Sequence, residues 1–178
     1  GAGVGPGSGP GSGAGAGAGA VAGAEPSPPS RAGVAEGAAR TGRSPEAVDL
    51  IVPVFTVVGD TPEEQAPYKE RAKSQIAFYG STRNYGFQFD MLGFEGTSAK
   101  LNERLKAGDI AGMSDLITDE MLEHYAVTAS WSELGPKLVE RYRGVAARVV
   151  LYQAEESLRK DPSVITKWAG VAEAVRSA

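Results

Sequence analysis

The stretch VDLIVPVFTVVGDTPEE, residues 48–64, joins a dense run of β-branched residues directly to a helix start. A continuous apolar run of this kind is typical of a strand buried on both faces in a parallel sheet. The predicted strand covers Val48–Val58. Pro53 lies inside it and removes a ladder donor, so we expect a bulge or a split strand there.

The helix start follows immediately. Thr61 can cap the helix, Pro62 takes the first helical position, and Glu64 completes a capping box. The helix is predicted to run from Pro62 to about Tyr79, with Gly80 as its stop. A strand followed at once by a helix is the repeating unit of α/β proteins.

The same alternation returns near the C-terminus. Residues Tyr125–Ala129 predict a short strand, the box Ser130–Glu133 a helix start, and Arg148–Tyr152 a buried strand. Together they predict a parallel strand-helix-strand unit. Asp161 and Pro162 then begin a last helix.

The middle of the chain is predicted to be helical. Residues 81–96, STRNYGFQFDMLGFEG, are rich in aromatic residues and glycine and indicate a packed excursion. Short helices are predicted at Ser98–Ala107, at Ala111–Ile117 and from Thr118, and another over Val34–Arg40. The class is therefore α/β, with about three visible strands whose open edges need a cover.

Composition separates the chain into two parts. Residues 1–30 are a low-complexity Gly/Ala-rich segment, with 11 of the 24 glycines before residue 24, and we interpret them as a disordered tail. This segment has neither the basic start nor the apolar centre of a signal peptide. Residues 31–178 are the predicted domain. No targeting or transmembrane segment stands out, so a cytoplasmic location is the default expectation, with no membrane partner.

Charge and cysteine content exclude several classes of function. The chain of 178 residues has a net charge of −4, no cysteine and one histidine, His124. The acidic balance argues against nucleic acid as a partner. The absence of cysteine removes disulfides, thiolate metal sites and cysteine nucleophiles, and a single histidine excludes a histidine-rich metal site.

Five segments, in this order, resemble the C-terminal part of the luciferase-like monooxygenase superfamily, and within it the deazaflavin-dependent oxidoreductases. They are AARTGRSPEAV (38–48), VDLIVPVFTVVGDTPEE (48–64), QIAFYGSTRNYGFQFDMLGFEG (75–96), LNERLKAGDIAGMSDLITDEML (101–122) and VTASWSELGPKLVERYRGVAARVVLY (127–152). Where the family commonly has Val-x-Gly-Thr before the penultimate helix, this chain has Ala129 and Ser130. The serine still serves as a cap.

The resemblance implies a fold, a cofactor and a reaction. The fold is a TIM-type (β/α)8 barrel, of which residues 31–178 would be the incomplete C-terminal portion. The cofactor would be FMN or coenzyme F420, bound at the C-terminal mouth of the strands. The reaction would be hydride transfer or monooxygenation of a small-molecule substrate. Because the family's cofactor contacts come mostly from earlier strands, binding by this chain alone is doubtful, and we expect it to be inactive in isolation.

Four residues are candidates for lining a substrate pocket. Asp60 follows the first strand, where a barrel would place its active-site face, although a turn next to a helix cap explains it equally well. Tyr85, Phe87 and Phe89 alternate in the excursion and form either a pocket wall or part of the core. His124 fits a helix-end role better than general-base catalysis. No catalytic residue and no metal ligand can be assigned.

Two other interpretations stay open. The chain could be a non-enzymatic half-barrel that associates with itself or with another chain through its exposed strand edges. It could also be a self-sufficient small α/β domain with a new activity, which predicts a cooperative thermal transition of the monomer.

Overall fold

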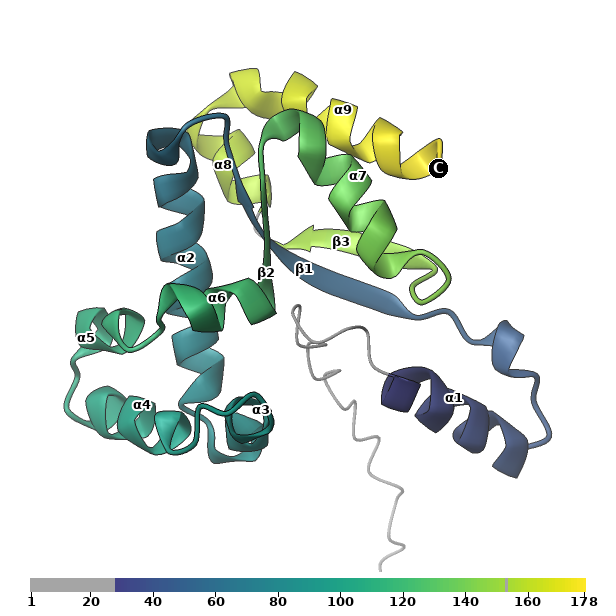
Figure 1. Ribbon diagram of the computed structural model, residues 1–178, viewed down its shortest axis with the longest axis horizontal. Helices are drawn as coiled ribbons and strands as arrows, with labels where there is room; N and C mark the ends of the chain where they lie inside the picture. Colours follow the sequence, from purple (N-terminus) through teal and green to yellow (C-terminus); the bar gives the residue numbers. More distant parts are fainter. Residues whose placement is uncertain (1–27, 153) are drawn as a thin grey trace, which may run out of the picture.

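A computed structural model describes residues 28–152 and 154–178 (Figure 1). The strands are β1 (Ile51–Val58), β2 (Ala126–Ala129) and β3 (Arg148–Tyr152). The helices are α1 (Pro28–Arg40), α2 (Pro62–Gly80), α3 (Gly86–Met91), α4 (Thr97–Lys106), α5 (Ile110–Asp115), α6 (Asp119–Tyr125), α7 (Trp131–Tyr142), α8 (Ala154–Lys160) and α9 (Ile165–Arg176), with 3-10 turns at Pro45–Ala47, Arg83–Tyr85 and Pro162–Val164. The predicted low-complexity tail lies outside the described residues, apart from residues 28–30, which belong to α1.

The three described strands form one parallel sheet in the order β2-β1-β3. The mixed α/β class is therefore confirmed. The predicted strand-helix-strand unit is parallel as expected, but β1 lies between its two strands. In a barrel, successive strands are neighbours around the sheet. Because β3 pairs with β1 instead of β2, the described strands do not follow that order. That the chain is the incomplete C-terminal portion of a barrel stays a prediction.

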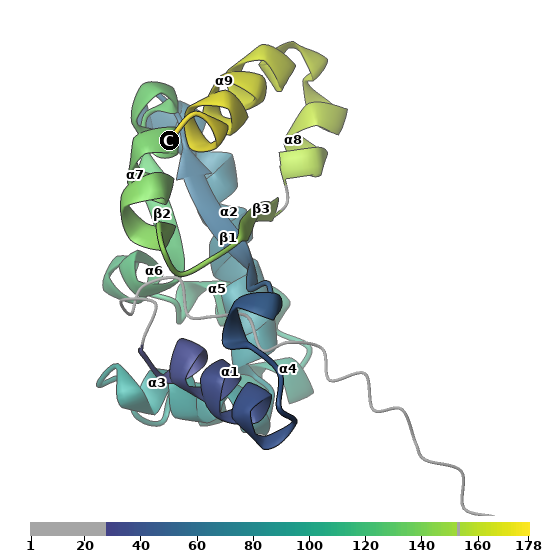
Figure 2. The ribbon, with the colours of Figure 1, turned by 90° about the vertical axis from the view of Figure 1, so that its right-hand side faces the viewer.

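Helices cover the two faces of the sheet unequally. Helix α2, which leads from β1 to β2, packs on one face, and α7, which leads from β2 to β3, packs on the other together with α9 (Figures 1 and 2). The first connection runs from β1 outward to β2, and the second runs back from β2 across β1 to β3, so two connections of the same hand must cross opposite faces. This is the arrangement of doubly wound α/β sheets.

The α2 face carries the first of two hydrophobic cores. Val57 of β1 and Ala126 of β2 meet Ile76 of α2, and the short helices α3 to α6 close the core from outside. Phe89 is the largest side chain that is fully enclosed there. The predicted excursion, residues 81–96, is thus packed against this core. The three short helices expected after it are each present, to within about a residue of the predicted start.

The opposite face carries the second core, which joins α7 and α9 to the sheet. Val54 and Val58 of β1 contact Leu134 and Leu138 of α7, and Trp168 of α9 completes the cluster. The predicted last helix is thus present as α9, preceded by α8 and a 3-10 turn.

The predicted irregularity at Pro53 is absent. β1 runs unbroken from Ile51 to Val58, and Pro53 keeps its register opposite Val150 of β3. The prediction of a bulge or a split strand was wrong because β2 pairs only with Phe55–Val58, so among the described residues one side of β1 has no partner strand at Pro53. A proline is tolerated in a strand whose edge is open on the side of its missing N–H.

Burial of the strands is also less complete than predicted. Ile51 and Val150, both on the α2 face, are 54% and 44% exposed. α2 covers this face only toward the carboxyl ends of the strands. Near the amino ends of the strands, no helix of the described part of the chain covers the same face (Figure 1). β3 is therefore a half-exposed edge strand. We call Ile51, Pro53 and Val150 the open face.

Caps set the helix boundaries much as the sequence predicts. The Thr61 hydroxyl accepts the backbone N–H of Glu64, at 3.3 Å. The Glu64 carboxylate, however, accepts the N–H of Asp60, one residue before the position expected for a reciprocal box. At the start of α7, Glu133 accepts the backbone N–H of Ser130 at 3.3 Å, as predicted.

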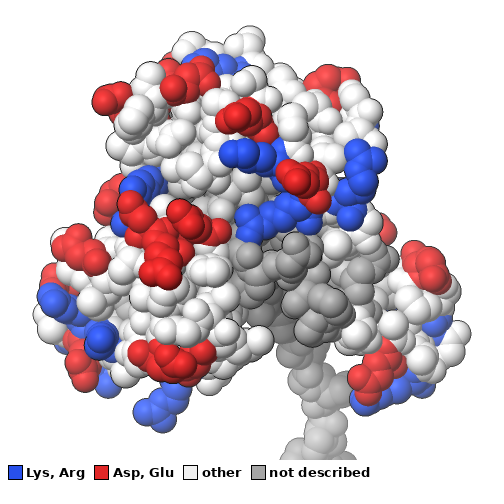
Figure 3. All heavy atoms as spheres, viewed as in Figure 1, with Lys and Arg blue, Asp and Glu red and all other residues white. Residues whose placement is uncertain are grey.

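A charged contact joins α6 to α2. Asp119, in the first turn of α6, lies 2.7 Å from the ammonium groups of both Lys69 and Lys73. Hydrogen bonds from these two lysines lower the pKa of Asp119 to about 2. Acidic and basic side chains are interspersed over the face of the molecule seen in Figure 3. Asp119 and its two lysines are therefore only a few of many surface charges.

Replacing Asp119 with Asn should cost less than about 1 kcal/mol at pH 7, because the pair is largely exposed. The folded-state pKa lies below the ordinary value of 3.8, so the contribution is complete above pH 4 and is lost as the pH falls from about 4 toward 2. Urea unfolding at pH 7, 4 and 3 measures this. Glu120→Gln, in the same helical turn, controls for the helix dipole. If the difference in unfolding free energy between the two variants did not change with pH, Asp119 would not stabilise the protein through its charged contact with Lys69 and Lys73.

Candidate functional site

The strongest candidate site lies at the carboxyl edge of the sheet. The ends of β1 and β2 are adjacent there, with Val58 opposite Ala129 and the Gly59 N–H donating to the Ala129 carbonyl at 3.2 Å. In open α/β sheets, ligands bind outside the carboxyl ends of the strands, where connections diverge to opposite faces. α2 and α7 diverge in this way from the ends of β1 and β2.

Two carboxylates tie the strand ends together. Asp60 Oδ1 accepts the backbone N–H of Trp131 at 3.1 Å, so a residue after β1 caps the helix that follows β2. Glu64 Oε2 accepts the N–H of Asp60 at 3.0 Å and the indole N–H of Trp131 at 3.2 Å. The backbone N–H of Asp60 is the main cause that lowers the pKa of Glu64, so this carboxylate is charged at neutral pH.

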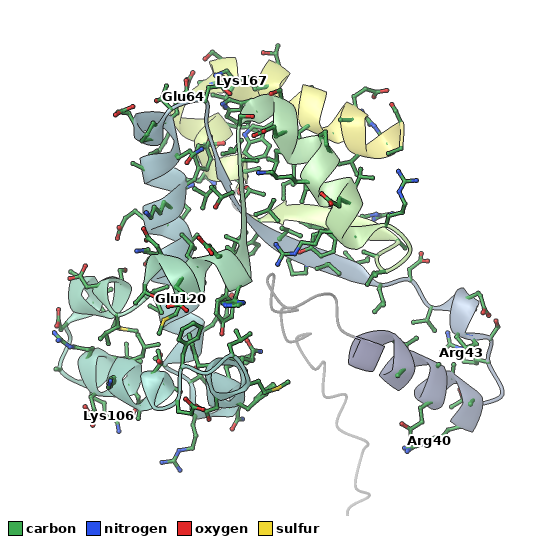
Figure 4. All side chains as sticks on the ribbon, in the orientation of Figure 1. Arg40, Arg43, Glu64, Lys106, Glu120 and Lys167 are labelled. Carbon is green, nitrogen blue, oxygen red and sulfur yellow. The ribbon has the colours of Figure 1, made fainter. Side chains whose placement is uncertain are left out.

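Lys167 extends the cluster to α9. Lys167 and Glu64 lie close together at the amino end of α2 (Figure 4). Lys167 Nζ lies 3.6 Å from Glu64 Oε1 and 5.2 Å from the centroid of the Trp131 ring. The first distance is longer than a hydrogen bond, and the second is within the range of a cation–π contact. The ammonium group therefore lies over the indole and forms a long ion pair with the Glu64 carboxylate.

Three aromatic rings form the wall beside these charges. The centroids of Tyr68 and Trp131 are 6.2 Å apart, those of Trp131 and Trp168 are 5.0 Å apart, and all three pairs meet edge to face. Trp168 is buried, and its indole N–H donates to Ser157 Oγ at 2.9 Å. Such edge-to-face contacts stabilise a wall beyond its apolar burial.

Together these groups enclose a crevice of about 280 Å³ between α2, α7, α8 and α9. Its lining combines the half-buried side chains of Tyr68, Trp131 and Val164 with charged side chains of both signs. The residues lining it are Glu64, Pro67, Tyr68, Arg71, Trp131, Ser157, Lys160, Asp161, Ser163, Val164 and Lys167. We call this cavity the strand-end crevice.

The structure does not bring the four predicted pocket residues together. Asp60 stands at the amino end of α2, next to the strand-end crevice, whereas Tyr85, Phe87 and Phe89 follow the carboxyl end of the same helix. A helix of 19 residues is about 28 Å long. The two groups therefore lie at opposite ends of α2 (Figure 1).

The three aromatic residues of the excursion have different surroundings. Phe89 is 2% exposed and lies in the first core, which is the alternative that its sequence left open. Tyr85 is half-buried and meets Tyr79 edge to face, at 6.2 Å. Phe87 is 55% exposed. A pocket-lining role for Tyr85 and Phe87 remains a prediction.

Sequence reasoning missed most of the strand-end crevice. Trp131 carries a usable signal, because it follows the capping serine of the helix after β2 and so lies at the same sheet edge as Asp60. Lys167 carries none, since it comes from α9, more than thirty residues later, and is brought back by packing of α9 on α7. The structure alone joins these residues.

Other candidate chemistry receives less support. His124 is in the last turn of α6, where its ring meets Phe94 edge to face at 5.7 Å. Among the described residues, no three His, Cys, Asp or Glu side chains gather in a way that could hold a metal ion. Within the same part of the chain, no helix combines the length and the apolar character needed to cross a bilayer.

Comparison with known proteins identifies the family. The sequence profile of the luciferase-like monooxygenase family matches residues 17–148, so the chain belongs to this family. An uncharacterized protein of Mycobacterium bovis and another of Mycobacterium tuberculosis are each 33% identical to it over 114 residues. This match covers 64% of the chain but 34% of each relative, so the chain spans about a third of the length of these relatives. No solved structure matches the chain.

Proposed function

We propose that this chain is part of an oxidoreductase of the luciferase-like class. It would supply strands from the C-terminal part of that enzyme, and the carboxyl ends of these strands would border the ligand site. Such an enzyme would move a hydride between FMN or coenzyme F420 and a small-molecule substrate, or use reduced flavin and oxygen for monooxygenation. The observation that carries the proposal is the family match over residues 17–148. Support also comes from the strand-end crevice, which lies at the sheet edge where α/β enzymes bind ligands.

The described residues do not fit a whole flavin or deazaflavin. The strand-end crevice, at about 280 Å³, is at the lower limit of the roughly 300–1,000 Å³ that pockets for drug-sized ligands enclose. Two of its cations, Arg71 and Lys160, already contact Glu156, at 2.6 and 3.0 Å. We therefore expect the isolated chain to bind neither cofactor tightly, and we assign no chemical step to its residues.

A graft tests the proposal directly. The M. tuberculosis relative is first titrated with FMN and with coenzyme F420, and its matched 114-residue segment is then replaced by the corresponding residues of this chain. The graft should bind the same cofactor as its parent within about tenfold, while the isolated chain should show a Kd above about 100 µM for both. Cofactor fluorescence gives the binding curves.

Two outcomes would contradict the proposal. One is a graft that melts cooperatively but no longer binds the cofactor of its parent. The other is a parent that binds neither cofactor. Tight binding by the isolated chain would instead overturn the statement that the described residues do not fit a flavin.

The open face supports a second candidate function. Ile51, Pro53 and Val150 expose an apolar surface, and β3 offers an unpaired edge beside it within the described part of the chain. Exposed parallel edges favour pairing with another chain. On this reading the chain is a non-enzymatic half-barrel that associates with itself or with another chain. Sedimentation velocity from about 1 to 100 µM separates the two: concentration-dependent dimers favour this candidate, and a monomer throughout disfavours self-association.

A further inference from the structure

The outer edge of β3 is open. β3 pairs with β1 on one side, and within residues 28–152 and 154–178 no strand lies along its other side. Figure 2 shows β3 on the outer side of β1. β3 contains no proline, so each of its five residues keeps a backbone N–H group. Unpaired N–H and C=O groups on such an edge can pair with a further strand.

The backbone of the opposite edge strand is protected. Three of the four residues of β2 are buried. Lys137 Nζ donates to the Thr128 carbonyl at 3.1 Å, and Arg141 Nη1 donates to the Ala126 carbonyl at 3.5 Å. In the described part of the chain, no side chain donates to a carbonyl of β3, and none of the five residues of β3 is buried. A strand that extends the sheet is therefore expected at β3.

The middle of β3 lacks the features with which edge strands avoid pairing. Natural edges often carry a lysine, a proline or a bulge. Val149, Val150 and Leu151 are apolar, and β3 keeps an unbroken register with β1. Val150 is 44% exposed on the open face, while its two neighbours are half-buried on the opposite face. Both faces of this edge can therefore contact apolar side chains of an added strand.

Symmetry makes a second copy of the chain a suitable partner. A two-fold axis perpendicular to the sheet would place β3 antiparallel to its own copy and keep equivalent faces on the same side. The axis then passes beside one residue, which lies opposite itself. With the axis at Val150, the midpoint of β3, all five residues have a partner. An axis at Arg148 would instead place two like charges opposite each other.

The register centred on Val150 also matches the side chains on the α2 face of β3. Val150 would lie against its own copy, and Arg148 would lie opposite Tyr152 of the second copy. These three residues alternate along the strand and therefore share one face. Arg148 makes no ion pair with the described residues, so its guanidinium can lie over the tyrosine ring, which is a favourable contact.

We propose that two copies of this chain associate through antiparallel pairing of their β3 strands, centred on Val150, and so form one continuous sheet with three strands from each copy. The proposal rests on the half-barrel candidate function, for which it names a second copy as the partner and β3 as the contact. It does not depend on an oxidoreductase activity. Because the contact is a single pair of strands, we expect a reversible dimer with a Kd on the order of 100 µM.

Single cysteines test the register. The chain has no cysteine, so an introduced one reports only its own contact. Val150→Cys should form an intermolecular disulfide under mild oxidation, because opposite Cα atoms in an antiparallel pair are about 4.5–5.5 Å apart. Ile51→Cys is the matched control, since Ile51 is similarly exposed on the same face. The two β1 strands of the dimer would be about 14 Å apart, so this variant should cross-link at least about tenfold more slowly.

A charge placed on the two-fold axis tests the dimer without a covalent bond. Val150→Lys should abolish association, because the axis would bring two ammonium groups opposite each other. Ile51→Lys adds the same charge to the same face, outside the pairing edge, and should change the Kd by less than about twofold. Sedimentation velocity from about 1 to 300 µM measures both variants, and thermal melting verifies that each one folds. Should Val150→Lys unfold, the comparison of the two cysteine variants decides.

The outcomes separate the β3 contact from the candidate function on which it rests. A dimer that Val150→Lys leaves intact, or equal cross-linking at the two cysteines, would overturn the β3 contact. Association would then use another surface, and the half-barrel candidate would stand. A chain that stays monomeric up to about 300 µM would overturn the β3 contact and self-association together, and would leave that candidate only a different chain as its partner.

Discussion

Phe89→Ala should lower the free energy of unfolding by about 3–5 kcal/mol, the largest effect we expect from a single truncation in this chain. The Phe89 ring is 2% exposed and meets Tyr125 of α6 at a centroid distance of 5.5 Å. It also lies against Gly80: a Cβ added there would be 2.5 Å from the ring. Removing the ring would leave a cavity where α2, α3 and α6 meet. Urea denaturation followed by circular dichroism measures the change.

Phe87→Ala is the matched control, two residues away on the same short helix. Its side chain is 55% exposed, so truncation should change stability by less than about 0.5 kcal/mol. A cost at Phe87 that approaches the cost at Phe89 would contradict the described orientation of α3. Comparing the two variants therefore tests whether each phenylalanine is a core residue or lines a pocket. Truncating a core residue lowers stability, whereas truncating a pocket-lining residue affects binding.

Local signals made much of the fold predictable from the sequence. The apolar run that ends at Val58 and the cap at Thr61 fix the junction of β1 and α2, and both are read from adjacent residues. The same holds for the capping residues Thr118 and Ser130, which begin α6 and α7 where predicted. These features depend on backbone donors and side chains a few positions apart, so a single sequence contains them.

Features that depend on distant packing were not predictable. Pro53 suggested a bulge because a proline costs a ladder bond in a fully paired strand, but the length of β2 leaves that side of β1 unpaired. The exposure of Val150 likewise follows from how far α2 extends along its face of the sheet, and strand composition does not encode this. Asp60 was found by its position after a strand, whereas its partner Trp131 and the nearby Lys167 required the tertiary structure.

The contact between α7 and α9 could not be predicted from the sequence either. It requires a glycine at position 135. Gly135 is buried within α7, and a Cβ added there would lie 2.6 Å from the Cβ of Ala174 on α9. Real Cβ atoms do not approach so closely, so the two helices would have to separate. They carry Leu138 and Trp168 into the second core, and Trp168 also supports the wall of the strand-end crevice.

Gly135→Ala should therefore destabilise the protein by about 1–3 kcal/mol, although alanine is the better helix former. Gly170→Ala, inside α9 where an added Cβ meets nothing within 4 Å, should instead stabilise it by about 0.5–1 kcal/mol. The same substitution then has opposite signs in two helices that touch, because packing outweighs propensity at one position and propensity acts alone at the other. Thermal and urea unfolding of both variants measure the difference, and stabilisation at both positions would show that α9 does not pack on α7 at Gly135. Since Trp168 moves with α9, the Gly135 variant should also shift the tryptophan emission that reports on the crevice, whereas the Gly170 variant should leave that emission unchanged.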